Sequence, residues 1–272
     1  MTAKQKYLFD LNGYLHIKDV LVADELSNAQ LAIDRLLKMP TDKLPLGIGR
    51  SDGDDTSFSH AFSADKSLEV LTWHPVTRPI IKELTGGKPR FCRGRLTINT
   101  HHNQKLVRMH CAREDCGWQT RRYAVKDRHI KSDDFLCFIN FTEVYQDDGG
   151  LVDLTGSHKS EFERPSGIFF QNMEDPNHPL HSALVNVTPR AGDVVILSEL
   201  TVHGVLIWKP VDRDRRFLTL SYKPQYFTTH LGRRHSLLPD EVWERLSPET
   251  QELAQTTSYG HIKSIVSSSL TG

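Results

Sequence analysis

His110, in the stretch MHCARED at residues 109–115, occupies a position typical of a metal-binding histidine. A His-x-Asp/Glu pair and a distant second histidine form the donor set of many non-haem iron(II) sites. Two residues after His110, however, the chain has Ala112 where that pattern requires an acid. The stretch therefore raises two questions: whether a metal binds here, and what replaces the missing carboxylate.

A second histidine and an arginine could complete such a site from the C-terminal half. His203 follows an apolar strand pattern that begins after Gly192-Asp193, and Arg215 comes twelve residues after His203. That interval fits a strand, the turn KPVDRD and a return strand, so both side chains are expected near one mouth of an antiparallel barrel. A lone histidine is more often a structural residue of the core, so this pattern alone does not establish a metal site.

The elements that must position these residues are short strands. Residues 90–223 contain seven runs rich in β-branched or aromatic residues and separated by turn residues. Helical spacing of apolar residues occurs before them, at 23–39 and 67–86, and after them, at 238–254. This order predicts an α+β fold with a jelly-roll core and flanking N-terminal and C-terminal helices. The runs are RFCRGRLTINT, DFLCFINFTEV, GLVDLTG, ALVNVTP, DVVILSE, VHGVLIW and RRFLTLSYK.

The composition is that of an ordinary globular protein. The chain has 272 residues, with 34 Lys and Arg against 34 Asp and Glu, so no global charge favours a nucleic acid polymer or an anionic membrane. It shows no repeat, linker, signal-like start or membrane-length apolar run, and we expect one domain over residues 1–272 in a cytoplasmic protein. The four cysteines form no CxxC pair and are expected to be reduced, and a zinc site at His110, Cys111 and Cys116 would match no usual spacing.

Three segments together resemble the phytanoyl-CoA dioxygenase family of iron(II)- and 2-oxoglutarate-dependent enzymes. They are DLNGYLHIKDVL at 10–21, DDGGLVDLTGSH at 147–158 and the pattern GD…HG…R over 192–215. The resemblance covers nearly the whole chain and implies a double-stranded β-helix, related to cupins, that uses Fe(II), 2-oxoglutarate and O2.

The resemblance also implies roles for particular residues. His110 and His203 correspond to the metal ligands, and Arg215 to the arginine that binds the distal carboxylate of 2-oxoglutarate. Arg213 and Arg216 are the alternatives if this register is shifted. His158 of the GSH segment is assigned to a structural turn and not to the metal.

Ala112 departs from the pattern of most members of this family. Members that halogenate unactivated carbon carry Ala or Gly at this position, because losing the carboxylate opens a coordination position that chloride can fill. The resemblance thus implies a halide site at Ala112 and a halogenase. A hydroxylating oxygenase that tolerates Ala112 and a metal-free scaffold without catalysis remain the alternatives.

Further contacts are expected on two strands. Alternation along RFCRGRLTINT places Arg93, Arg95, Thr97 and Asn99 on one face, which indicates a polar cavity wall. Thr97 and Asn99 are candidates to bind 2-oxoglutarate, with solvated surface as the alternative. Phe138, on the strand before DDGG, lies where the family places groups against 2-oxoglutarate, although packing explains it equally well.

The expected substrate is small and anionic. The segment 112–134 is rich in Arg and Lys, and Arg121, Arg122 and Tyr123 could bind a phosphate and stack a base. Arg93, Arg95 and His60 are further candidates, the last within a polar segment at 45–63 expected to be a long lid-like loop. A phosphorylated nucleoside such as (deoxy)adenosine monophosphate is predicted, without a carrier protein. A free or carrier-bound amino acid is the alternative substrate, and mutual neutralisation of charges the alternative explanation of the segment.

Overall fold

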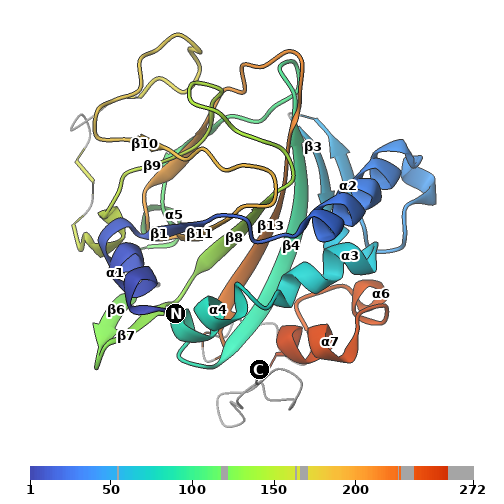
Figure 1. Cartoon of the computed structure of the whole chain (residues 1–272), viewed down its shortest axis with the longest axis horizontal. Coiled ribbons are helices and arrows are strands. Elements are labelled where there is room, and N and C mark those ends of the chain that lie inside the picture. The colour runs from blue at the N-terminus through green and yellow to red at the C-terminus, as the bar shows by residue number, and fades with distance from the viewer. Residues whose placement is uncertain are drawn as a thin grey trace.

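Two antiparallel sheets form the centre of the molecule (Figure 1). The computed structural model describes residues 1–53, 55–117, 122–162, 164–165, 171–225, 227 and 236–256. The larger sheet has the strand order β1-β11-β8-β13-β4-β3-β2, and the smaller has β10-β9-β12-β5. The strands of the larger sheet are β1 (Tyr14–Ile17), β2 (Arg50–Asp52), β3 (Thr56–Ser59), β4 (Pro89–Asn99), β8 (Phe135–Asn140), β11 (Val194–Ser198) and β13 (Arg215–Pro224). Those of the smaller sheet are β5 (Val107–His110), β9 (Gly150–Asp153), β10 (Val185–Asn186) and β12 (His203–Leu206).

The helices lie before, between and after these strands, and a separate hairpin joins β6 (Tyr123–Lys126) to β7 (His129–Ser132). The α-helices are α1 (Ala3–Asn12), α2 (Ala23–Lys38), α3 (Lys66–Glu69), α4 (Arg78–Leu84), α5 (Ala112–Cys116), α6 (Asp240–Trp243) and α7 (Pro248–Ala254). Short 3-10 turns occupy Thr41–Lys43, Ala61–Ser63, Val70–Trp73 and Ser157–Lys159. The predicted α+β fold with a double-stranded β-helix and flanking helices is confirmed, and each of the seven predicted strand runs contains a strand.

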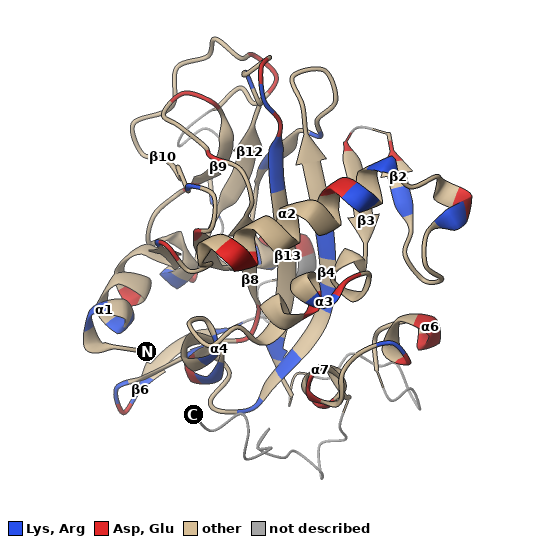
Figure 2. Cartoon of the chain, turned by 45° about the vertical axis from the view of Figure 1, so that its right-hand side comes forward, with Lys and Arg blue, Asp and Glu red and all other residues tan. Residues whose placement is uncertain are grey.

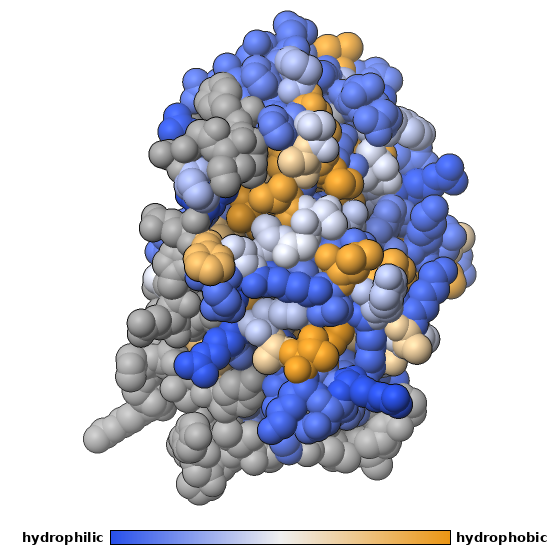
Figure 3. Space-filling model, turned by 90° about the vertical axis from the view of Figure 1, so that its left-hand side faces the viewer, coloured by the Kyte–Doolittle hydropathy of each residue, from blue (hydrophilic) through white to orange (hydrophobic). Residues whose placement is uncertain are grey.

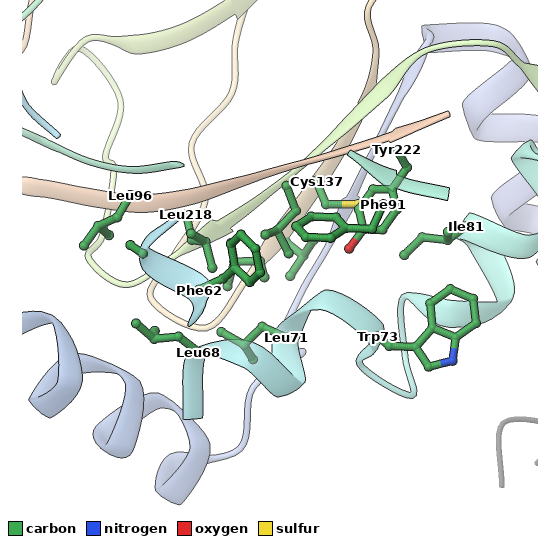
Figure 4. Packing of buried hydrophobic residues seen from close by; sticks show 14 of the residues in the cluster. Phe62, Leu68, Leu71, Trp73, Ile81, Phe91, Leu96, Cys137, Leu218 and Tyr222 are labelled. Atoms are coloured by element: carbon green, nitrogen blue, oxygen red, sulfur yellow. The ribbon is translucent and has the colours of Figure 1, made fainter. Parts of the chain in front are cut away.

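Alternation along β4 separates the core from the interior of the barrel. Phe91 and Leu96 point to the outer face of the larger sheet, where they pack with Phe62 and Leu68 from the helical layer (Figure 4). The rings of Phe62 and Phe91 meet edge to face, with centroids 4.8 Å apart. Burial of these side chains anchors β4, so the opposite face of the strand is held towards the smaller sheet.

The segment at 45–63 is not the long loop that the sequence predicted. It contains β2 and β3, which pair with each other, and β3 also pairs with β4. Serine and threonine supply most of β3, so its apolar content is too low to indicate a strand. The hairpin extends the larger sheet beside the barrel.

Gly13 joins two of the family-like segments. It ends α1 in the left-handed conformation, with φ 84°, and its N–H donates to the Phe9 carbonyl. A β-carbon there would lie 2.6 Å from Nδ1 of His158 and 2.4 Å from Oγ1 of Thr201. Only glycine meets both requirements, which explains the NGY motif and places buried His158 in a structural role.

None of the described helices is long and apolar enough to cross a membrane. The face of the molecule shown in Figure 3 is mostly hydrophilic with apolar residues interspersed. Among the described side chains, Cys92, Cys111 and Cys137 are buried free thiols.

Candidate active site

A cavity of about 690 Å³ lies between the two sheets. The larger sheet supplies Asn99 and Arg215 to its wall, and the smaller sheet supplies His203 and Val205. His110, at the end of β5, also lines this cavity. The residues predicted to bind a metal and a dicarboxylate therefore open into one space.

His110 and His203 lie opposite each other on paired strands, with ring centroids 4.5 Å apart. Nδ1 of His110 is 2.9 Å from the Arg108 carbonyl, and Nδ1 of His203 is 2.7 Å from the Thr201 carbonyl. Carbonyl oxygens only accept, so each Nδ1 carries the hydrogen and each Nε2 keeps a free lone pair. Both Nε2 atoms therefore carry the lone pair that a metal could accept.

Burial sets the charge of His203. Burial, together with the neighbouring His110, lowers the pKa of His203 to about 4. The His203 imidazole is therefore neutral at physiological pH, which is the form that binds a metal.

Arg215 is the buried cation of the cavity, and its exposed fraction is only 4%. Its Nε and Nη1 have no hydrogen-bond partner among the described residues, and its guanidinium lies 4.2 Å from the centroid of the Phe217 ring. Burial lowers its pKa to about 10, so it remains charged at neutral pH. A buried cation whose donors have no partner lowers the stability of the folded protein unless an anion pairs with it. A carboxylate matches the planar arrangement of the guanidinium donors.

Gly150, beside Arg215, leaves room for this side chain. A β-carbon at Gly150 would lie 3.3 Å from Nε and Cζ of Arg215, and its φ of +83° also favours glycine. Arg213 and Arg216, the alternatives in the sequence, are held elsewhere by carboxylates: Arg213 by Asp148, and Arg216 by Asp34 and Asp214.

Thr97, Asn99 and Phe138 all line the cavity. Asn99 lies opposite Arg215 in the β4–β13 register, and Thr97 lies opposite Phe217. Phe138 lies opposite Thr219 on the other side of β13. The three side chains thus border the space that Arg215 faces.

Ala112 begins α5 and is buried, and its backbone N–H donates to the Glu199 carbonyl at 2.7 Å. Its methyl group is absent from the cavity wall described above. Among the described residues, no three His, Cys, Asp or Glu side chains are already clustered to hold a metal. Within the described part of the chain, therefore, no third ligand is already positioned beside the two histidines.

Three acids that sequence reasoning missed line the cavity: Asp55, which is paired with Arg95, and Asp115 and Glu199. Oδ2 of Asp115 lies 3.9 Å from Nε2 of His110. Burial, together with nearby Asp134, raises the pKa of Glu199 to about 7. The sequence signal for Glu199 was weak: one charged residue between the end of β11 and the start of β12.

The predicted substrate residues divide into two groups. Arg93 and Arg95 line the cavity, whereas Arg122, Tyr123 and His60 do not. Arg121 lies outside the described residues.

Within the segment at 112–134, Asp115 lines the cavity, but the predicted substrate residues Arg122 and Tyr123 do not, and these two predictions need correction. Arg122 is exposed and directly precedes the β6–β7 hairpin. The Tyr123 hydroxyl donates to Asp10 at 2.7 Å, and its ring lies against His158 with centroids 4.4 Å apart. His60 packs edge to face with Phe62, on the helical side of the larger sheet.

The cavity wall carries more basic than acidic residues. Arg95 is paired with Asp55, and Arg108 with Glu174. Basic residues along β4 and β13 are visible in Figure 2. The basic residues of the wall are Arg93, Arg95, Lys105, Arg108 and Arg215, and the acidic ones Asp55, Asp115 and Glu199.

The double-stranded β-helix is the fold of the iron- and 2-oxoglutarate-dependent oxygenases of the phytanoyl-CoA dioxygenase type. A profile of the phytanoyl-CoA dioxygenase (PhyH) family matches residues 9–205. The chain belongs to this family.

Solved structures share the fold. HygX from Streptomyces hygroscopicus, with nickel and 2-oxoglutarate bound, aligns with a TM-score of 0.64 and 20% identity over 82% of this chain and 87% of that chain. The α-ketoglutarate-dependent epimerase SnoN of nogalamycin biosynthesis aligns at 0.58 and 18%, covering 82% of each chain. The carbocyclase SnoK aligns at 0.57 and 19%, over 83% of this chain and 85% of that chain. No curated protein matches the sequence significantly.

Proposed function

We propose that this protein oxidises an unactivated carbon–hydrogen bond of a small molecule, using iron(II), 2-oxoglutarate and O2. The observation that carries the proposal is the unpartnered guanidinium of Arg215, buried in the same cavity as the two histidines. Bound iron with 2-oxoglutarate would supply the oxidant that removes a hydrogen atom from carbon.

The roles of the residues follow from their positions. His110 and His203 would hold iron through Nε2, and Arg215 would pair with the distal carboxylate of 2-oxoglutarate. Thr97 and Asn99 offer hydrogen bonds to that carboxylate, and Phe138 would cover the cosubstrate and exclude water.

Halogenation is the second candidate, and Ala112 is the observation that favours it. An alanine at this position removes an anionic ligand and leaves a coordination position to which chloride could bind. A chloride bound there would supply the chlorine that replaces the removed hydrogen of the substrate, instead of a hydroxyl group.

An anaerobic titration separates these two reactions. We expect the apoprotein to develop a visible charge-transfer band when Fe(II) and 2-oxoglutarate are added together. A band that shifts on adding chloride would support halogenation, and a band unaffected by chloride would support oxygenation. Absence of any band would overturn the proposal of an iron- and 2-oxoglutarate-dependent enzyme.

We propose an anionic substrate, of which a phosphorylated nucleoside is the leading example and for which no carrier protein is required. Its support is the basic cavity wall formed by Arg93, Arg95, Lys105 and Arg108. A phosphate near these side chains would gain charge-assisted hydrogen bonds.

Paired compounds test the charge of the substrate. We expect 2-oxoglutarate consumption to be stimulated at least tenfold more by adenosine or deoxyadenosine monophosphate than by the matching nucleoside, a difference of about 1.4 kcal/mol. Free amino acids provide the comparison class. Equal stimulation by the neutral nucleoside would contradict an anion-binding substrate site.

A further inference from the structure

We propose that Glu199 supplies the carboxylate that position 112 lacks, as the third protein ligand of the metal bound by His110 and His203. This inference rests on the proposed function, since it requires a metal at the two histidines. It goes further by assigning the missing acid to the segment that connects β11 to β12.

The backbone places Glu199 directly beside the gap. Its carbonyl accepts the N–H of Ala112 at 2.7 Å, and its own N–H donates to the Asp134 carbonyl at 3.0 Å. Ala112 lies two residues after His110, where the family pattern has the acid. A side chain that starts at Glu199 therefore begins next to the one that is absent at Ala112.

Glu199 lines the same cavity as His110 and His203, and the charge of His110 influences its carboxylate. No hydrogen bond to the carboxylate oxygens of Glu199 occurs within the part of the chain that the structure describes. Because a half-buried carboxylate at a cavity wall without a donor can accept a cation, a metal ion at the histidines would give it a partner.

One of the two other cations that act on Glu199, Lys223, is already engaged by a carboxylate. Nζ of Lys223 lies 2.8 Å from Asp134, and this ion pair is largely buried. Arg93 also acts on Glu199, but its side chain is exposed. The Glu199 side chain has three rotatable bonds and no partner that fixes them, so it can turn towards a metal once one is bound.

Two other acids are weaker candidates for this role. The side chain of Asp115 is 54% exposed, although it lies 3.9 Å from Nε2 of His110, so water competes for it. Asp153 lies opposite His203 on β9 and is fully buried, but it accepts a hydrogen bond from Thr155 and does not line the cavity. Neither of them begins beside Ala112.

A third ligand from Glu199 also bears on the choice of reaction. It would restore a two-histidine, one-carboxylate set with a donor from a new place in the chain. The coordination position that a halide would need is then filled, so this inference favours oxygenation over halogenation.

Metal affinity provides the test, independent of turnover. Apoprotein of the wild type and of Glu199→Gln, Asp115→Asn and Asp153→Asn would be titrated anaerobically with Fe(II), and with Co(II) for its absorption spectrum. We expect Glu199→Gln to weaken metal binding at least tenfold. Removing a residue that only orients a metal ligand already lowers metal affinity about 10–100-fold, so losing a ligand should cost at least as much. The two Asn variants are expected to bind within threefold of the wild type.

A compensating variant guards against a merely structural effect. Glu199→Gln combined with Ala112→Asp should regain most of the lost affinity, because the acid returns beside the same coordination position. A wild-type protein that binds no metal would overturn the proposed function itself. Wild-type binding with an unchanged Glu199→Gln affinity, or a loss confined to Asp115→Asn or Asp153→Asn, would overturn only the role of Glu199.

Discussion

Replacing Arg215 by Gln is expected to abolish productive binding of 2-oxoglutarate, raising its Kd by a factor on the order of 100 or more. Arg215 has two donor nitrogens without partners in the interior of the barrel, and truncating one member of a buried charge pair costs about 2–5 kcal/mol. The measurement is the concentration of 2-oxoglutarate that half-saturates the charge-transfer band of the iron-loaded protein.

Stability should change in the opposite sense. Arg215 carries an uncompensated buried charge before the cosubstrate binds, so Arg215→Gln is expected to keep or raise the Tm of the apoprotein. Matched controls are Arg213→Gln and Arg216→Gln, whose guanidinium groups pair with carboxylates outside the site. If Arg216→Gln weakened 2-oxoglutarate binding as strongly as Arg215→Gln, the assignment of the cosubstrate arginine would be wrong.

The positions of the cavity residues on β4 suggest how two molecules share the space. Asn99 lies opposite Arg215 at one end, and Arg93 lies six residues away on the same face. At about 3.3 Å per residue, the two ends are roughly 20 Å apart. A cosubstrate bound by Arg215, as proposed, would leave the Arg93 end of the cavity for the substrate.

Much of this arrangement could be predicted from local sequence patterns. Period-two alternation places Arg93 and Thr97 on the face of β4 opposite Leu96, because strand geometry directs successive side chains to opposite faces. A bulge in the pairing with β13, between the partners of Arg93 and Phe91, brings Phe91 to the same face as Leu96. The spacing from His203 to Arg215 likewise reflects two strands and a turn. Such features depend on neighbours in the chain, so the sequence contains them directly.

Other features depend on contacts that no local pattern records. Tyr123 faces the core because the β6–β7 hairpin packs against Asp10 and His158, far away in the chain. His60 is turned by a left-handed backbone, with φ 57°, towards Phe62 instead of the cavity. Glu199 gains its place through the hydrogen bond between its carbonyl and Ala112, which lies 87 residues earlier.

Replacing His203 by Gln is expected to remove metal binding, with a loss of affinity of about 100-fold or more. Structural zinc sites with four ligands bind with about 10–16 kcal/mol, or roughly 3 kcal/mol per ligand, and an amide is a much poorer donor than imidazole. His203 is 6% exposed, and its Nδ1 is held by the Thr201 carbonyl. Among the described residues, His110 is the only other histidine that lines the cavity. The measurement is Fe(II) or Co(II) titration of the apoprotein, with thermal unfolding to establish that the variant folds.

His60→Asn is the matched control, because His60 was a candidate in the sequence but lies outside the cavity, and asparagine tolerates its left-handed backbone. It should keep wild-type metal affinity. Since the expected charge-transfer band needs both the metal and 2-oxoglutarate, His203→Gln should lose the band as well, whereas Arg215→Gln should keep the metal and lose only the cosubstrate. A folded His203→Gln variant with undiminished metal affinity would mean that the metal binds away from the paired histidines.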